Sequence, residues 1–555
     1  MAADTDGRLG RALERLLVPA AGAAVLVFVT VGIWRPIWLD EAISLSIARD
    51  SLGGIAERLR NDNNFPLYYF LLHAWTRLFG DAEPAARLLS GIFYIGGTAA
   101  MYAGGRWMGL AKRAALYASF FFLASMQAIH QAQNVRMYAL LGFLSALSTV
   151  CFCREFASGG GSRWNRVLYI SVNAAGLLTH LWYPFVLMGQ LAAVVLWRGP
   201  RRVAVFVMEA AIAAAPFAIL WAPSFLAQMH NGATAHDWMP TLNPWLALRA
   251  IVDFYGSLPV ALAIYALCGL LAFRRRGVDM RRGAQRRMER PSVPRSRGRP
   301  LGPADTSVCA TYGTALRAAI FEGDLAGRLA RFWMTCAAVS LAVPLAISAF
   351  KPIYWPGRYT IITLPPLAFL IGATLSRLAN KSVLTALCFA ILALDVAEHV
   401  RTRDINPETN LPAGSSDKAT AQLLLRNAQP GDALIFTSLS RPAVDYYLRR
   451  YHAESRFVEI SFPRENGVHI GWRDATAAGQ RGAMLRAEAA GVIDRLRELH
   501  GRTWVLYGYD PAVAGILKAQ LDRSLTLHKE NPMPGPYHTL VLEYGAATRG
   551  TGGHE

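Results

Sequence analysis

Two acids stand side by side in the segment RPIWLDEAIS (35–44), which directly follows the first long apolar run of the chain. Removing a carboxylate at a membrane face from water costs free energy, and a carboxylate does not anchor a chain to anionic lipid. Asp40 and Glu41 therefore need another purpose at this place. A carboxylate held near a reacting centre can accept the proton of an attacking hydroxyl group.

Four further polar side chains lie within or at the ends of other apolar runs: Arg136, His180, Lys351 and Arg358. Taken singly, an Arg at a helix end is usually an interfacial anchor, and a lone His in an apolar segment is usually a packing residue. Cationic side chains can also hold a lipid-linked phosphate. Together with the acids, they favour a site in which cations bind a phosphate while a carboxylate takes up a proton.

The composition indicates that membrane-spanning helices carry these residues. The chain has 555 residues, of which 53% are hydrophobic and only 17% charged, whereas about 25% is usual for a soluble protein. The 167–197 run is too long for one span, and we read it as two helices that meet near 177–185. We predict about eleven transmembrane helices. They come from the uncharged runs 16–33, 88–105, 114–135, 137–153, 167–197, 210–229, 254–273, 332–350, 360–376 and 382–394.

The arginine-rich connections predict the orientation of the helices, because short cytoplasmic loops are enriched in Lys and Arg. The N-terminus, read as an uncleaved first helix, and the basic loop 274–331 should be cytoplasmic. The predicted connections alternate correctly between the two sides of the membrane only if the short segment 65–80 lies along the membrane instead of crossing it. The outer face then receives the loop 35–83 and everything after about residue 400. The acids and cations named above meet at that face.

The basic loop invites a nucleic-acid interpretation, since its first part, 274–300, has eleven Arg against Asp279 and Glu289. It lacks the interleaved aromatic residues and the folded motif that such binding needs. We therefore expect no nucleic-acid partner and read the loop as a topology determinant that touches anionic lipid. None of the six cysteines falls in the predicted outer part, so we expect no disulfides there.

The composition changes after residue 400. Short apolar segments that read as strands alternate with amphipathic segments that read as helices, which predicts an α/β domain over 400–555 after a membrane domain over 1–399. The predicted strands are 431–439, 503–509 and 538–544, and the predicted helices are 441–452, 490–500 and 510–523.

Six motifs occur in a fixed order across about residues 35–370. They are WLDEA (38–42), NNFPLYYFLLHAWTRLFG (63–80), EPAARLLSGIF (83–93), QNVRMYALL (133–141), LLTHLWYPFVLMGQ (177–190) and GRYTIITLPPLAFL (357–370). This ordered set resembles the polyprenyl-phosphate-sugar-dependent membrane glycosyltransferases of the GT-C fold. That group includes protein O-mannosyltransferases and the lipid A aminoarabinose transferases, and the set is family 39/83-like. The resemblance implies a polytopic α-helical GT-C membrane domain whose outer loop, 35–83, is catalytic.

The resemblance also implies roles for individual residues. Asp40 matches the family's general base, with Glu41 as a second catalytic candidate beside it. Asn134 stands where the family usually has a Glu. The candidates for binding the donor phosphate are Arg136, Arg358 and Lys351. The candidates for binding substrate are His180, Tyr138, Tyr68 and Tyr359, of which Tyr68 is a stacking residue or a member of the interfacial belt.

These roles describe one reaction. A polyprenyl phosphate is already a good leaving group, so no nucleotide site is needed, and none is visible in the sequence. One carboxylate base without a carboxylate nucleophile implies a single displacement with inversion at the anomeric carbon. We expect transfer from a polyprenyl-phosphate-linked sugar to a hydroxyl on a glycan, lipid or protein acceptor. The expected location is the periplasmic face of the inner membrane, in a multi-pass protein.

The sequence leaves several points open. We expect no cofactor, but a divalent metal stays open, because the segment 229–240 offers His230, His236 and Asp237 at a spacing that matches no zinc signature. The sugar, the acceptor and the oligomeric state are not indicated. A transporter or flippase for lipid-linked sugars is the alternative function. Transporters more often show symmetry-related halves and broken helices at mid-membrane, whereas this chain gathers its charges at one face.

Overall fold

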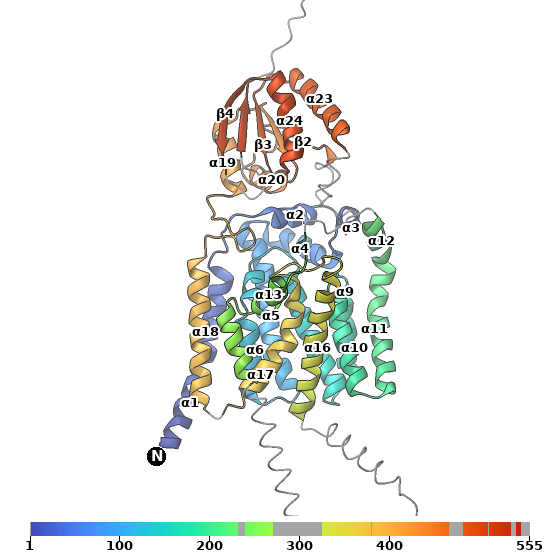
Figure 1. Cartoon of the computed structure of the whole chain (residues 1–555), viewed down its shortest axis with the longest axis vertical. Helices are drawn as coiled ribbons and strands as arrows, with labels where there is room; N and C mark the ends of the chain where they lie inside the picture. Colours follow the sequence, from blue (N-terminus) through green and yellow to red (C-terminus); the bar gives the residue numbers. More distant parts are fainter. Residues whose placement is uncertain are drawn as a thin grey trace, which may run out of the picture.

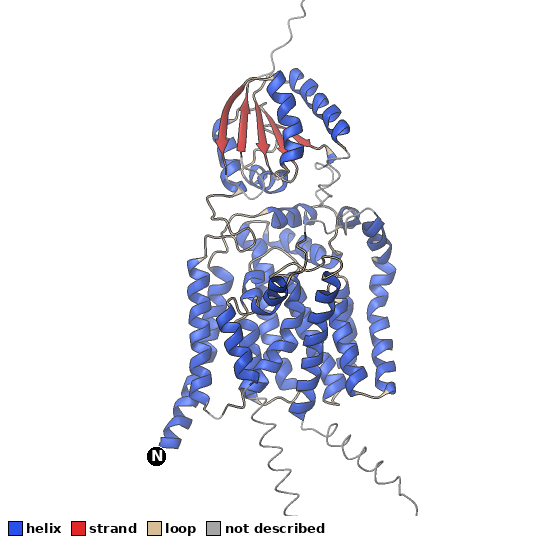
Figure 2. Ribbon diagram, viewed as in Figure 1, coloured by secondary structure: helices blue, strands red, loops and turns tan. Residues whose placement is uncertain are grey.

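The computed structural model describes residues 2–545 apart from 61, 231–238, 270–324, 379, 466–480, 509 and 534–539. A layer of long helices carries a smaller unit at one end, and the short helices α2 to α4 lie between the two (Figure 1). All of the described strands belong to the smaller unit (Figure 2). Most of the predicted basic loop, 274–324, lies outside the described residues.

Helices that suit a lipid environment make up the large layer. Five of the described helices are long and apolar enough to cross a membrane: α1 (Ala2–Thr30), α8 with η1 (Tyr138–Ala157), α11 (Pro200–Leu220), α16 (Leu325–Ser348) and α18 (Lys381–Arg401). Shorter apolar helices are α10 (Pro184–Trp197), Leu258–Gly269, and η2 with α17 (Tyr359–Leu375). The layer also contains α5 (Glu83–Trp107), α6 (Lys112–Leu123), α7 (Met126–Ala132), α9 (Arg163–Leu177), α12 (Ala222–His230) and α13 (Pro244–Val252). Large apolar side chains such as Ile219 and Leu26 are 75% and 65% exposed, which is costly in water and favourable in lipid. The number of eleven transmembrane helices stays a prediction.

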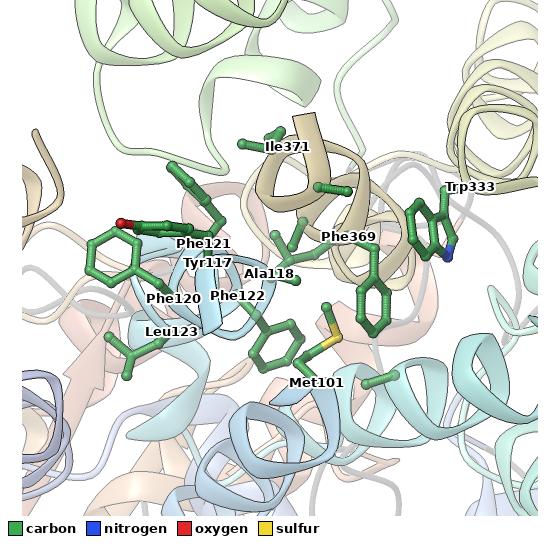
Figure 3. Packing of buried hydrophobic residues seen from close by; sticks show 14 of the residues in the cluster. Met101, Tyr117, Ala118, Phe120, Phe121, Phe122, Leu123, Trp333, Phe369 and Ile371 are labelled. Carbon is green, nitrogen blue, oxygen red and sulfur yellow. The ribbon is translucent and has the colours of Figure 1, made fainter. Parts of the chain in front are cut away.

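The centre of this layer is a core of aromatic side chains from α6 that pack against α5 and α17 (Figure 3). Trp333 of α16 stacks on Phe369 of α17 with ring centroids 5.2 Å apart. Gly372 allows α17 to approach α6 closely, because a Cβ atom at this position would overlap the backbone of Ala118. This packing fixes the start of α17 and therefore the segment just before it, which carries Arg358.

Two breaks in the apolar runs bring polar residues to one region. The run 114–135, predicted as one uninterrupted segment, forms α6 and α7 with a break at Ser125. The Ser125 hydroxyl donates to the carbonyl of Phe254 at 2.7 Å and joins the break to another part of the layer. The run 167–197 forms two helices, α9 and α10, as predicted. Arg136 follows the first break, and His180 lies in the second.

The outer loop folds into three short helices, α2 (Leu39–Ala48), α3 (Leu52–Arg60) and α4 (Pro66–Phe79). Helix α4 has only 14 residues, whereas about 20 are needed to span a bilayer. It ends at Gly80, whose φ of 79° suits glycine at a helix C-terminus. The length agrees with the prediction that this segment does not cross the membrane, while its position along the membrane stays a prediction.

The smaller unit is a five-stranded sheet between two layers of helices. Its strands are β1 (Ala433–Thr437), β2 (Val458–Phe462), β3 (Thr503–Tyr507), β4 (Leu527–Pro532) and β5 (Leu540–Tyr544), in the order β2-β1-β3-β5-β4. Strand β1 is parallel to both of its neighbours, and β5 is antiparallel to both of its own. Along β1, Leu434 and Phe436 pack with α19 (Asp417–Asn427) and α20 (Arg441–Arg450), whereas Ile435 packs with α23 (Gly482–Glu498) and α24 (Pro511–Ser524). The period of two therefore gives the sheet two apolar faces, each covered by helices.

The sequence pattern predicts three of these strands and misses β2 and β4. Both missed strands lie at the edges of the sheet. Strand β4 has the sequence LHKENP and is largely exposed, so its side chains carry no apolar signal.

The smaller unit docks on the outer loop through α20. The Tyr447 hydroxyl accepts the backbone N–H of Ile37 at 2.7 Å and donates to Glu83 at 3.3 Å. Lys418 forms an ion pair with the same Glu83 at 3.3 Å, and Arg449 pairs with Asp81 at 3.3 Å. The contact with Ile37 holds the segment that immediately precedes α2, and the others hold the chain at the start of α5.

Candidate active site

A cavity of about 550 Å³ lies among the outer loop, the breaks described above and the segment before η2. This volume is within the usual range for a small-molecule site. Six of the residues predicted from the sequence line it: Asp40, Arg136, Tyr138, His180, Arg358 and Tyr359. They come from parts of the chain more than 300 residues apart, so the fold gathers them into one place.

Asp40 lies in the first turn of α2 and is only 4% exposed. The N-terminal end of a helix favours a negative charge. Its Oδ2 atom lies 3.3 Å from Nη1 of Arg358 and 3.9 Å from Nε of Arg136. The carboxylate therefore lies between two arginines.

Arg136 is buried in the link between α7 and α8, and mostly neutral groups surround it. Its Nη1 atom donates to the hydroxyl of Tyr69 at 3.3 Å, and its Nη2 atom donates to Oδ1 of Asn64 at 3.2 Å. Its Nε atom has no hydrogen-bond partner among the described residues. A buried cation whose hydrogen-bonding capacity is incompletely used is suited to an anionic ligand.

Arg358 is held more firmly. Its guanidinium lies against the rings of Trp38 and Trp355, with centroids at 5.3 Å and 5.4 Å. It donates through Nε to Oε2 of Glu408 at 2.8 Å, and through Nη1 to Asp40. Burial lowers the pKa of Arg358, but its neighbours, Glu408 first among them, raise it by more, so the group stays charged.

Glu408 is the site residue that the sequence reasoning missed. It lies in the loop that follows α18, is 11% exposed at its side chain and lines the same cavity. Its Oε1 atom accepts hydrogen bonds from Gln131 at 3.2 Å and from Asn134 at 3.0 Å. The signal available here, an acid soon after an apolar run, is shared with Asp404 in the same segment RDINPETN (403–410), so it does not single out Glu408.

Glu41 points away from the cavity despite its position beside Asp40. Its two carboxylate oxygens accept hydrogen bonds from Arg87 of α5, at 2.8 Å from Nε and 2.5 Å from Nη2. Both side chains are almost completely buried. Glu41 also accepts the backbone N–H of Val135 at 3.1 Å. It joins α2 to α5 and to the segment that carries Arg136.

Three aromatic rings form one wall of the cavity. The His180 ring lies 5.6 Å from Tyr138 and 5.1 Å from Tyr359 between centroids. His180 is in the turn between α9 and α10, where its Nδ1 atom accepts the backbone N–H of Trp182 at 3.1 Å. Burial, and to a lesser extent the charge of Arg136, lower the pKa of His180 to about 3. The wall is therefore uncharged at neutral pH and suits the apolar face of a sugar ring.

Besides Glu41, two of the predicted residues do not line the cavity. Tyr68 is fully buried within the outer loop, and Lys351 is exposed in the turn that follows α16. Among the described residues, no group of three His, Cys, Asp or Glu side chains is arranged to hold a metal ion. Of the loop residues considered for a metal, His236 and Asp237 lie outside the described part of the chain.

Comparison with known proteins adds evidence on the fold. No family model matches the chain, and no curated protein matches it in sequence. The apo crystal structure of ArnT from Cupriavidus metallidurans is similar over 96% of this chain and 98% of that one, with a TM-score of 0.56 and 14% identity. The structure of the same protein bound to undecaprenyl phosphate covers 95% and 98%, with a TM-score of 0.57 and 14% identity. The chain has the GT-C fold.

The likeness, together with the apolar helices, shows a multi-pass membrane protein. The aligned region covers nearly the whole of both chains. At 14% identity the likeness shows the fold alone. The chemistry of this chain must therefore be inferred from its own residues.

Proposed function

We propose that this protein is a membrane glycosyltransferase, which moves a sugar from a polyprenyl-phosphate donor to an acceptor hydroxyl on the periplasmic face of the inner membrane. The observation that carries the proposal is the cavity in which Asp40 lies beside Arg136 and Arg358. An acid between two buried cations suits proton removal and phosphate binding in one step. The ArnT structure with undecaprenyl phosphate supports a lipid phosphate as the ligand class.

In the proposed reaction, the acceptor oxygen attacks the anomeric carbon while the bond from that carbon to the phosphate oxygen breaks. The acceptor proton passes to Asp40. The closest approach of each arginine to Asp40 is to Oδ2, and we assign Oδ1 as the atom that takes the proton. The electron pair of the broken bond stays with the departing polyprenyl phosphate, whose charge Arg136 and Arg358 neutralise. A single displacement inverts the configuration of the sugar.

Asp40→Asn tests this assignment. Because the proton moves only in the transition state, transfer should fall by about two orders of magnitude or more while donor binding changes little. Asp50→Asn is the matched control, since Asp50 belongs to the same loop but pairs with Arg58 near the surface. Transfer would be measured with purified protein in lipid nanodiscs, using the lipid-linked sugar that accumulates in a deletion strain. Near-normal turnover of Asp40→Asn would remove Asp40 as the base.

The same purified proteins distinguish the transferase from the alternative, a flippase for lipid-linked sugars. A flippase in proteoliposomes would move the intact donor across the bilayer without forming a glycosylated product. Movement of the donor by both the wild type and Asp40→Asn, with no product from either, would replace the transferase proposal.

A further inference from the structure

Glu408 reaches the cavity from a segment outside every motif that pointed to the site. Its carboxylate touches two separate segments. Oε2 contacts Nε and Nη2 of Arg358 at 2.8 Å and 2.7 Å, just before η2. Oε1 accepts hydrogen bonds from Gln131, near the end of α7, and from Asn134, in the link between α7 and α8. One side chain thus joins the segment of Arg358 to the segment of Arg136.

The loop around Glu408 does not need this carboxylate for its own fold. The N–H of Asn406 donates to the carbonyl of Leu411 at 3.0 Å, and the N–H of Ala413 donates to the carbonyl of Asp404 at 2.8 Å. The Asn406 side chain also accepts the backbone N–H of Glu408 at 2.8 Å. The loop is closed by these bonds, so the carboxylate is directed into the cavity by a turn that other groups hold.

The hydrogen-bond donors of Arg358 are divided between two carboxylates, those of Glu408 and Asp40. Glu408 occupies Nε and Nη2, which orients the planar guanidinium, and Nη1 then points to Asp40. Glu408 also takes up part of the charge of Arg358. Without it, Arg358 would lose the contacts that direct its Nη1 atom to Asp40.

We propose that Glu408 is a positioning residue for the transfer reaction. It fixes Arg358 and shares the charge of that cation, so that Asp40 keeps its contact with Nη1 of Arg358. Asn134 has an amide instead of a carboxylate, and Glu408 brings a carboxylate to the same place. The Asn134 amide donates a hydrogen bond to that carboxylate at 3.0 Å. This inference rests on the proposed transferase function.

The test moves the carboxylate between the two positions. Glu408→Gln keeps the size of the side chain and removes its charge, so kcat should fall by about tenfold to a hundredfold, as for a misplaced catalytic group. The KM for the donor should change by less than about threefold, because removing an anion does not weaken phosphate binding. Asn134→Glu alone places a second carboxylate against Glu408 and should also lower kcat. The double variant Asn134→Glu/Glu408→Gln exchanges acid and amide and should recover at least about tenfold over the worse single variant.

Asp404→Asn is the control, because Asp404 belongs to the same loop and is 75% exposed at its side chain. Its kcat should equal that of the wild type. Thermal unfolding of each variant identifies any that fail to fold, and the double variant then decides. A merely structural Glu408 would give a loss of folded protein with normal kcat per folded molecule, and the exchange would recover nothing. Either that result or wild-type kcat in Glu408→Gln overturns the inference while leaving the transferase standing. Absence of transfer by the wild type overturns both.

Discussion

Glu41→Gln is expected to damage the fold more than the chemistry. The substitution keeps the shape of the side chain but leaves Arg87, 2% exposed, without its buried counter-ion. Breaking a buried pair by removing one partner typically costs about 3–5 kcal/mol. Arg87 keeps three backbone acceptors, the carbonyls of Ile33, Arg35 and Pro36. We therefore expect the low end of that range, about 3 kcal/mol.

A double-mutant cycle measures the pair itself. Arg87→Met leaves those three carbonyls without their donor and leaves Glu41 as a buried anion, so it should cost at least as much as Glu41→Gln. Glu41→Gln/Arg87→Met removes both charges and should be more stable than the sum of the single losses predicts, by about 2 kcal/mol. Thermal unfolding in one lipid composition gives the stabilities, and transfer per folded molecule gives the activity. Glu398→Gln, which breaks an exposed pair with Arg401, should leave both quantities unchanged.

Two results would refute this reasoning. Wild-type stability in Glu41→Gln would show that the pair with Arg87 does not hold α2 in place. A normally stable Glu41→Gln that loses about a hundredfold in transfer would make Glu41 the base, in the range usual for loss of such a group. Asp40 would then lose that role, although it lines the cavity and Glu41 does not.

Three further predictions concern other parts of the site. Arg358→Gln should raise the donor KM about tenfold or more and Arg358→Lys should recover only part of it, because Lys lacks the planar fork; unchanged donor affinity would take Arg358 out of the phosphate site. Thermal stability should fall as the pH drops from about 6.5 towards 3, because the unfolded chain then protonates His180, whose pKa is about 3 when folded; His180→Asn should lose less between pH 7 and pH 5. Tyr447→Phe leaves the N–H of Ile37 without its acceptor, at a cost of about 1–3 kcal/mol; faster limited proteolysis of the 402–416 link and lower transfer would show this.

The parts of the site that could be predicted from the sequence are those whose chemistry is conspicuous in an apolar setting. Asp40, Arg136, His180 and Arg358 each stand next to a long apolar run, and the structure brings them to one cavity. Local sequence could not show that Asp40 and Glu41 face different ways. That outcome depends on Arg87, a residue of another helix that binds Glu41 and draws it out of the cavity.

Glu408 was missed for a different reason. It lies on a polar segment at the start of the α/β unit, where acids are common and carry no signal by type alone. Its role depends on contacts with Gln131 and Arg358, which are 277 and 50 residues away in the chain. Similarly, the exposed edge strand β4 has no apolar pattern from which a strand could be predicted. Residues whose partners are distant, or whose side chains meet solvent, leave little trace in the sequence.

The contact of Tyr447 with Ile37 also bears on how the protein is made. These residues are 410 positions apart, and Ile37 lies just before α2, the helix that carries Asp40. During synthesis the helices up to α18 emerge first, and the partner of Ile37 emerges only with α20. A chain that stops before residue 441 therefore has every transmembrane helix of the described part but lacks the hydrogen bond that holds the start of α2. The α/β unit, which is made late, therefore completes the outer loop, which is made early, and the ribosome must reach α20 before the segment that leads to Asp40 is fully supported.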